Sequence, residues 1–130
     1  KTHLDLNVWK TSTRLAIDIY LLTKTFPREE LFGVTSQMRR AAFSVPSNIS
    51  EGAGRSSKPE FIRFLNIANG SLSELETQLY ITREIGFYDD EAFAKYCNRI
   101  NHIRAQIMVL KNIYKNNHNH NHLVTLSPCH

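Results

Sequence analysis

The sequence of 130 residues has little of what marks secreted, membrane-spanning or disulfide-stapled proteins. Its two cysteines, Cys97 and Cys129, are too few for a disulfide framework, which favours a reducing, cytoplasmic location. No apolar run approaches the roughly 18 residues that cross a membrane, and the first residues lack the apolar core and cleavage site of a signal peptide. We therefore expect a cytoplasmic protein with no membrane partner.

Catalytic and metal-binding motifs are also missing. No Gly-x-Ser-x-Gly elbow occurs, and the glycines of EGAGR (51–55) follow a helical pattern without the Gly-Lys-Ser/Thr of a phosphate-binding loop. The carboxylate pairs Glu29–Glu30 and Glu74–Glu76 have no histidine or other metal ligand at helical spacing, so acid–base catalysis has little support. We predict a protein that is not an enzyme, with no catalytic residues, no metal ligands and no cofactor.

Negative charge is absent from the C-terminal part of the chain, because no aspartate or glutamate follows Glu91. The net charge is +4 and the pI is about 9.2, a balance that permits contacts with nucleic-acid phosphates without requiring them. The alternative interpretation is that these charges only keep the helices soluble. The predicted phosphate contacts are Arg39, Arg40, Arg55, Lys58, Arg63, Arg99, Arg104, Lys111 and Lys115.

What the sequence does contain is the 3.6-residue apolar period of an amphipathic helix, which occurs four times, whereas no two-residue alternation indicates a strand. Four such helices with short connections predict an all-α, up-and-down antiparallel four-helix bundle in residues 1–115. The predicted helices run from about Asn7 to Thr25, from Thr35 or Ser36 to Gly52 or Gly54, from Ser57 to about Gly86 and from Asp89 to about Tyr114.

The third helix has the most regular apolar face, whose members are separated by alternating steps of four and three residues. These members are Phe61, Leu65, Ala68, Leu72, Leu75, Leu79 and Thr82. The apolar face of the first helix includes Val8, Trp9, Leu15, Ala16, Ile19, Tyr20 and Leu22. The predicted caps are Asp5 or Asn7 for the first helix, Thr35 or Ser36 for the second, Ser57 for the third and Asp89 for the fourth.

The second helix contains a proline, in the stretch AAFSVPSNISEGAGR (41–55). Its apolar positions, namely Met38, Ala42, Val45, Ile49 and Gly52, keep their helical phase on both sides of Pro46. A loop would have no reason to preserve this phase, so we predict one helix that is kinked at Pro46. The proline costs roughly 3 kcal/mol in an unsupported helix, and packing must offset that cost.

Several large apolar side chains lie away from these core faces. On the third helix, Ile62 and Tyr80 lie about 100° from the core stripe, and Ile67 and Ile81 lie farther round. A wide buried face is one explanation, and an interface between subunits is the other, which we favour. The predicted interface residues are Phe43, Pro46, Ile62, Ile67, Tyr80 and Ile81.

The last segment, residues 116–130, is rich in asparagine and histidine, and we interpret it as a disordered tail. Its alternating histidines, His118, His120 and His122, have a spacing that can bind zinc or nickel in an extended chain. Only Cys129 could add a further ligand nearby, so the tail is predicted not to be a metal site.

Four stretches resemble a known family: VWK (8–10), FPREE (26–30), the segment 35–55 and the segment 60–87. Within them, S-x-P-S-N-I-x-E-G and G-S-L-x-E-L-E-T-Q-L are similar to motifs of the four-helix-bundle proteins encoded in intervening sequences of bacterial 23S rRNA genes. The resemblance implies a bundle that assembles as a ring-like homopentamer. Similar bundles include the accessory variability determinant of diversity-generating retroelements, a basic pentamer that binds nucleic acid and its reverse transcriptase.

For function, the resemblance implies association with RNA, and within the motifs it points to Arg39, Arg40 and Arg55 as phosphate contacts. We therefore predict a non-enzymatic oligomeric bundle that binds structured RNA or another nucleic acid. Weak sequence specificity is expected, because no aromatic platform interleaved with basic residues is visible. One alternative is a protein-interaction scaffold for a partner such as a reverse transcriptase or other polymerase, and another is an enzyme with a site between subunits.

Overall fold

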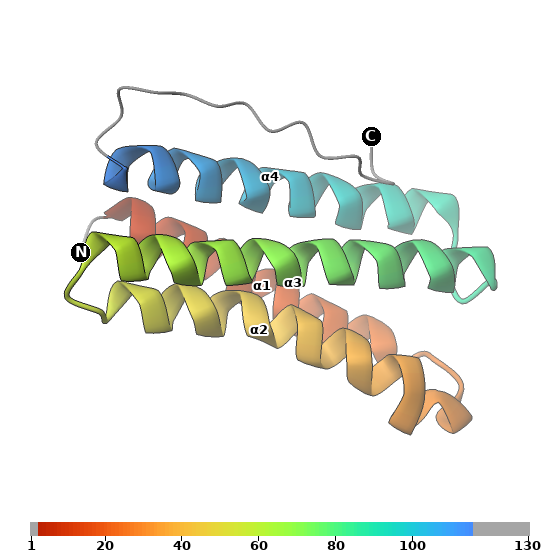
Figure 1. The fold of residues 1–130 in the computed structure, drawn as a ribbon. Coiled ribbons are helices and arrows are strands. Elements are labelled where there is room, and N and C mark those ends of the chain that lie inside the picture. Colours follow the sequence, from red (N-terminus) through yellow and green to blue (C-terminus); the bar gives the residue numbers. More distant parts are fainter. Residues whose placement is uncertain (1–2, 116–130) are drawn as a thin grey trace.

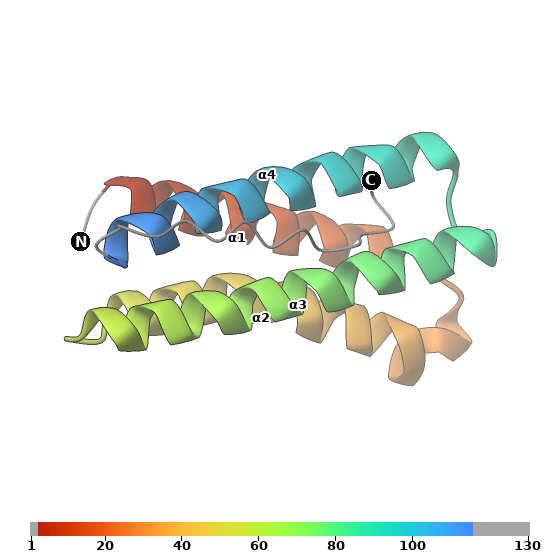
Figure 2. The same ribbon diagram turned by 45° about the horizontal axis from the view of Figure 1, so that its top comes forward.

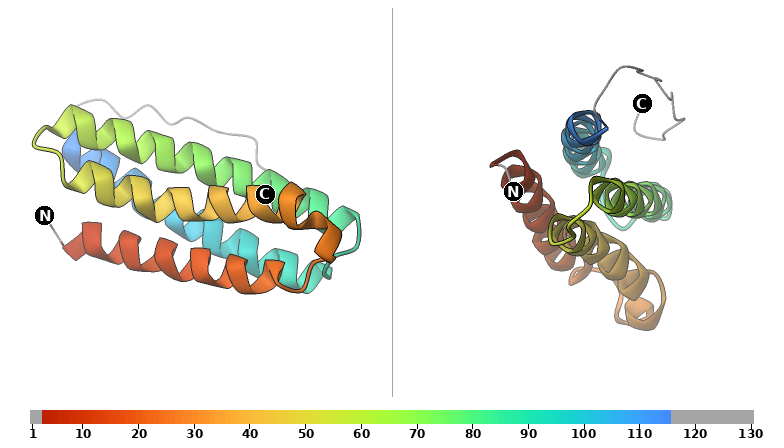
Figure 3. Two further views of the ribbon diagram at one scale, coloured as in Figure 1. Left: turned by 90° about the horizontal axis from the view of Figure 1, so that it is seen from below. Right: turned by 60° about the vertical axis from the view of Figure 1, so that its left-hand side comes forward.

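A computed structural model describes residues 3–115, which form four long helices joined by short connections. The elements are α1 (His3–Thr23), the 3₁₀ turn η1 (Arg28–Glu30), the π-type turn η2 (Leu31–Thr35), α2 (Ser36–Ala53), α3 (Lys58–Glu84) and α4 (Asp90–Tyr114). Successive helices run antiparallel and pack side by side, and α4 closes against α1 (Figure 1, Figure 3). The predicted all-α up-and-down bundle is confirmed, while the predicted tail and its histidines lie outside the described residues.

The core lies between two pairs of helices, with α1 and α4 above α2 and α3 in the view of Figure 2. All seven predicted core positions of α3 are buried, as are the core positions of α2 from Met38 to Gly52. Full burial of one leucine or isoleucine side chain stabilises a fold by about 1.5–3 kcal/mol. The regular face of α3 therefore contributes several such side chains to the packing that holds the bundle together.

Helix α2 runs without interruption through Pro46, and the proline ring is buried. On its C-terminal side, the Ser47 hydroxyl donates a hydrogen bond to the Phe43 carbonyl at 2.8 Å, and Asn48 Nδ2 donates to the Ser44 carbonyl at 2.8 Å. These side-chain bonds support the turn that the proline weakens by removing one backbone donor. The continuous helix is confirmed, whereas the kink at this residue stays a prediction.

Two of the predicted caps are confirmed. The Ser57 hydroxyl accepts a hydrogen bond from the Glu60 amide at 3.2 Å, and the Asp89 carboxylate accepts one from the Ala92 amide at 2.9 Å. Thr35 precedes α2, but its side chain makes no capping hydrogen bond. These bonds satisfy amide groups that a helix N-terminus otherwise leaves unpaired, and they fix where α3 and α4 begin.

The predicted start of the first helix is wrong, because α1 begins at His3 and includes Asp5. Asp5 is only 5% exposed, and its carboxylate accepts a hydrogen bond from the Tyr114 hydroxyl at 3.3 Å. The residue therefore links the first turn of α1 to the last turn of α4. A capping pattern alone cannot distinguish this role from that of an N-cap, because both place a short acidic residue near a helix start.

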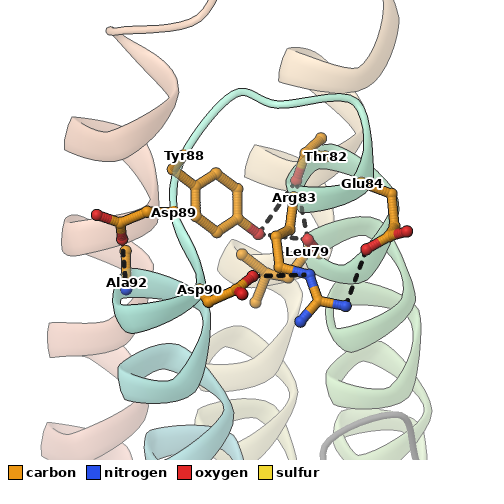
Figure 4. Close-up of polar contacts among 8 residues, drawn as sticks. All are labelled: Leu79, Thr82, Arg83, Glu84, Tyr88, Asp89, Asp90 and Ala92. Atoms are coloured by element: carbon orange, nitrogen blue, oxygen red, sulfur yellow. Dashed lines mark hydrogen bonds and ion pairs between the residues drawn. The ribbon is translucent and has the colours of Figure 1, made fainter.

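The turn between α3 and α4 is held by a cluster of hydrogen bonds (Figure 4). Gly86 has a φ of +90°, which favours glycine, and the Phe87 amide donates to the Thr82 carbonyl at 3.0 Å. The Tyr88 hydroxyl donates to the Leu79 carbonyl, and the Thr82 hydroxyl lies 3.2 Å from the Tyr88 oxygen. The turn therefore ends α3 and sets the direction in which α4 returns.

Tyr88→Phe is expected to lower the free energy of unfolding by about 1–2 kcal/mol near neutral pH, because it leaves the Leu79 carbonyl without this donor. Burial raises the pKa of Tyr88 to about 12, against about 10 in an unfolded chain. The stabilisation is therefore complete below about pH 10 and is lost as the pH rises from there through about pH 12. Urea titrations at several pH values measure this, with Tyr20→Phe at an exposed tyrosine as the control. A loss that does not shrink at high pH would contradict the assignment.

Candidate nucleic-acid interface

Three of the nine residues predicted to contact phosphate instead link helices within the chain. Arg39 on α2 donates from Nε to Thr23 Oγ1 at 2.8 Å, and its guanidinium lies 4.0 Å from the Tyr20 ring centroid. Arg99 on α4 forms an ion pair of 2.8 Å with Asp18 on α1. These two arginines tie α2 and α4 to α1, so their side chains are already engaged in the fold.

The third is Arg104 on α4, whose side chain is only 16% exposed and lies 3.3 Å from the Glu76 carboxylate on α3. Its other nitrogen lies 3.0 Å from Asn101 Oδ1. Glu76 is itself buried, so a phosphate could reach this arginine only by removing the partner of a buried carboxylate. The geometry therefore favours a structural role for Arg104, which the prediction of a phosphate contact did not anticipate.

Two more of the predicted contacts form ion pairs at the surface. Arg55 pairs with Glu51 at 2.7 Å, and Arg63 pairs with Glu60 at 3.2 Å. In each pair both side chains are about half exposed, so the pairing contributes less than about 1 kcal/mol. A phosphate can replace such a partner at small cost.

The remaining four, Arg40, Lys58, Lys111 and Lys115, have no ion-pair partner among residues 3–115. Burial, with a smaller contribution from the charge of Lys115, lowers the pKa of the Lys111 ammonium group. Lys111 lies in the last turn of α4 and Lys115 caps its C-terminus, where the negative end of the helix dipole favours cations. An anion at this end of α4 would further stabilise both charged groups.

The described lysines and arginines do not form one continuous surface. Most of their excess over aspartates and glutamates lies at one end of the bundle. There, α1 and α3 begin and α2 and α4 end (left in Figure 1), and we call this the basic end. Its lysines and arginines are Lys10, Arg55, Lys58, Arg63, Lys111 and Lys115, against the carboxylates Asp5, Glu51 and Glu60. Arg39 and Arg40 lie at the opposite end, where carboxylates are more numerous.

A recess of about 500 Å³ lies between α1 and α2 beside the basic end, and we call it the polar recess. It is lined by Trp9, Thr13, Pro46, Ser47, Ser50, Glu51, Gly54 and Arg55. Trp9 is 40% exposed, although its spacing predicts a core position. An indole, two serine hydroxyls and an arginine therefore face one space. The sequence contains this combination, but Trp9 and Arg55 are too far apart along the chain for spacing to reveal it.

A second recess of about 330 Å³ continues from the first along α1 and α2, and we call it the apolar recess. It is lined by Thr13, Ala16, Ile17, Tyr20, Leu21, Phe43, Pro46 and Ser47, of which Thr13, Pro46 and Ser47 also line the polar recess. The rings of Tyr20 and Phe43 stack with their centroids 6.3 Å apart. The two recesses form one groove with a polar half and an apolar half.

The predicted interface residues lie on three different faces. Phe43 is exposed in the apolar recess, and Ile67 and Ile81 are exposed on α3. Tyr80 is also exposed, although one side of its ring packs edge-on against Phe93 of α4. Ile62 is partly buried. Pro46 is buried on α2 and lines both recesses, and its contact with a neighbouring subunit stays a prediction.

Two further features are absent from the part of the chain that the structure describes. Within residues 3–115, no group of three or more histidine, cysteine, aspartate or glutamate side chains is placed to hold a metal ion. None of the described helices combines the length and the apolar character that crossing a membrane demands.

Comparison with known proteins gives matches to a family model and to solved structures. Residues 4–109 match the model of the family described as 23S rRNA-intervening sequence protein. The fold is similar to that of a protein of unknown function from the S23 ribosomal protein family of Bacteroides thetaiotaomicron, with a TM-score of 0.77 and 26% sequence identity. That similarity covers 86% of this chain and 98% of the other. No curated protein matches the chain.

Proposed function

The chain belongs to the family of 23S rRNA-intervening sequence proteins, and from this premise we propose that it is a non-enzymatic, homo-oligomeric bundle that binds RNA at its basic end. The observation that carries the proposal is the polar recess, in which an exposed indole lies beside Arg55 at the most cationic part of the described chain. RNA-binding proteins commonly combine phosphate contacts with stacking of unpaired bases on aromatic rings.

The phosphate contacts in this proposal come from the cations of the basic end. Lys58 and Lys115 are exposed and have no ion-pair partner among the described residues, and Arg55 can exchange Glu51 for a phosphate. Each phosphate that a cation neutralises releases counterions from the nucleic acid, so binding weakens as the salt concentration rises. This contribution attracts any RNA and is independent of its sequence.

The base contact comes from Trp9. A stacked base contributes about 1–3 kcal/mol in single-strand-binding proteins, and every base has a face that can stack. The polar recess falls in the size range of small-ligand pockets. The hydroxyls of Ser47 and Ser50 lie at its wall and offer hydrogen bonds to base edges. We therefore propose that the site holds an unpaired nucleotide of a structured RNA.

Two variants test the phosphate and base contacts separately, by measuring the affinity for an RNA hairpin with an unpaired loop over a range of salt concentrations. Trp9→Leu is expected to weaken binding about 5- to 150-fold without changing the salt dependence. The triple variant Arg55→Gln, Lys58→Gln, Lys115→Gln is expected to reduce the slope of log K against log salt by about two. The matched control is Lys24→Gln, Arg28→Gln, Lys95→Gln, which removes three cations from the opposite end.

Trp9 can also serve as an intrinsic fluorescent probe of RNA binding, because it is the single tryptophan of the chain. Its fluorescence is expected to be quenched by the RNA and not by heparin, which supplies negative charge without bases. Equal losses for the triple variant and its control, or binding that is insensitive to salt, would contradict the proposed site. Quenching by both polyanions would contradict the base contact alone.

The proposed homo-oligomer, a ring of five by family resemblance, is supported by the exposed apolar side chains on more than one face. Phe43 lies in the groove between α1 and α2, while Ile67 and Ile81 lie on α3. A closed ring needs two different faces on each subunit, because each copy contacts one neighbour with one face and the next neighbour with another.

A second candidate function is a scaffold for a partner protein such as a polymerase. The observation that favours it is a group of exposed apolar side chains on α4, namely Met108, Val109 and Ile113. Exposed apolar patches often mark protein interfaces. Binding of a defined polymerase subunit that survives nuclease treatment and is lost in Val109→Asp would favour this function over RNA binding.

A further inference from the structure

Phe32 is the most exposed large apolar side chain among the described residues, with 94% of its surface open to solvent. It lies in η2, within the segment that connects α1 to α2 at the end of the bundle opposite the basic end (Figure 3, left). Gly33 follows with non-helical φ and ψ of −111° and −117°, so the regular turn is broken directly after the ring. Full burial of a phenylalanine would be favourable by about 1.5–3 kcal/mol, and the single chain does not obtain this energy.

Two acidic side chains closely precede this ring, after Arg28 at the start of η1. Glu29 and Glu30 lie in η1 immediately before Leu31 and Phe32, and neither glutamate has an ion-pair partner among residues 3–115. Leu31 is also exposed. The segment 29–32 therefore presents two carboxylates followed by two apolar side chains.

The apolar recess has the complementary composition. Its walls include Ile17, Leu21 and Phe43, all of them exposed in the single chain. Its volume of about 330 Å³ leaves room for an aromatic ring. Cations border it, since Lys24 Nζ lies 5.7 Å and Arg39 Cζ 4.0 Å from the centroid of the Tyr20 ring that lines the recess.

We propose that Phe32 of one copy of this chain inserts into the apolar recess of a second copy, with Glu29 and Glu30 facing Lys24 and Arg39 of the receiving copy. The ring cannot fill the recess of its own chain in this conformation, because it is almost fully exposed. Apolar area buried on both sides and opposite charges at the rim together select a second copy as the occupant. The inference rests on the homo-oligomer proposed above and names the contact that forms it.

The donor segment and the receiving recess are different surfaces of the same chain. Each copy can therefore give its Phe32 to one neighbour and receive the Phe32 of another, and repetition of this contact produces a closed ring. Two copies can also exchange the rings reciprocally around a two-fold axis. In both arrangements one contact requires an intact Phe32 on one copy and an intact recess on the other.

This requirement gives a complementation experiment with the full chain, in which sedimentation velocity measures mass over a range of protein concentrations. Wild type is expected to be oligomeric, whereas Phe32→Ser and Phe43→Glu are each expected to be monomeric, with association weakened at least 100-fold. An equimolar mixture of the two variants is expected to form a one-to-one dimer, since the first retains the recess and the second retains the ring. Leu6→Ser, which removes an exposed apolar side chain from α1 outside both recesses, is the matched control and is expected to assemble as wild type does.

Each outcome decides a specific point. A wild-type chain that is monomeric at every concentration would overturn both the homo-oligomer and this contact. An oligomer that persists in Phe32→Ser would overturn the contact alone and leave the oligomer to another surface. Two variants that stay monomeric when mixed would also overturn it, provided that circular dichroism shows both to be helical and that Phe43→Ser, a milder change, behaves in the same way.

Discussion

Replacing Gly52 by alanine is expected to lower the free energy of unfolding by about 2–3 kcal/mol, as overpacking of a well-filled interface does. Gly52 lies in α2 where α3 crosses it, and a Cβ atom there would be 2.7 Å from Phe64 Cβ and 2.9 Å from Phe61 Cδ1. The first of these atoms cannot swing away, because it is attached directly to the backbone of α3. The two helices would have to separate, and the buried apolar side chains on both sides of the contact would lose part of their packing.

Gly70 on α3 provides the matched control, because no atom lies within 4 Å of the Cβ that an alanine would add there. Gly70→Ala is expected to stabilise the protein by about 0.5–1 kcal/mol, since alanine loses less conformational entropy than glycine when a helix forms. Urea denaturation followed by circular dichroism measures both effects. If Gly52→Ala were as stable as wild type, the close approach of α2 and α3 described here would be incorrect.

The largest expected effect of a single charge is that of Arg104→Ala, which should cost about 3–5 kcal/mol because it removes one partner of a buried ion pair. Glu76, only 2% exposed, would keep its carboxylate in the protein interior without the guanidinium that lies 3.3 Å from it. By comparison, Arg40→Ala at the surface should change stability by no more than about 0.5 kcal/mol. The same denaturation experiment compares the two arginines, which the sequence alone does not distinguish.

A double variant distinguishes the loss of the ion pair from other effects of substituting Arg104. Glu76→Leu combined with Arg104→Met replaces both charges by apolar groups of similar length, and such replacements are often neutral or stabilising. Recovery of wild-type stability in the double variant would identify the lost guanidinium partner of Glu76 as the cause of the loss in Arg104→Ala. If Arg104→Ala proved as mild as Arg40→Ala, and RNA binding fell instead, the original prediction that Arg104 contacts phosphate would be the better one.

The fold could be predicted from the sequence because apolar spacing along each helix carries the necessary information. The face of α3 that begins at Phe61 and ends at Thr82 is apolar at every expected position, and the structure buries all of it. The phase of α2 across Pro46 likewise predicted an uninterrupted helix. In both cases one periodic pattern decides the outcome, since a helix can bury only the face on which its apolar residues recur.

The candidate site was harder to predict, because spacing within one helix does not show how that helix is rotated against its neighbours. The apolar residues of α1 extend around much of its circumference, and Trp9 lies on the part that α2 leaves uncovered. Pairings such as Arg99 with Asp18 or Arg104 with Glu76 join residues on different helices that are far apart in sequence. Only the packed bundle shows which cations these carboxylates engage and which remain at the surface.

The shared wall of the groove has a thermodynamic consequence. Thr13, Pro46 and Ser47 border both recesses, so a molecule seated in one half meets atoms that also contact the occupant of the other half. If a nucleotide promotes docking of a neighbour by some factor, docking must tighten nucleotide affinity by that same factor, because the cycle of equilibria is closed. Assembly and nucleotide binding would then strengthen or weaken together. Pro46 lines both recesses, and its ring allows its backbone little freedom.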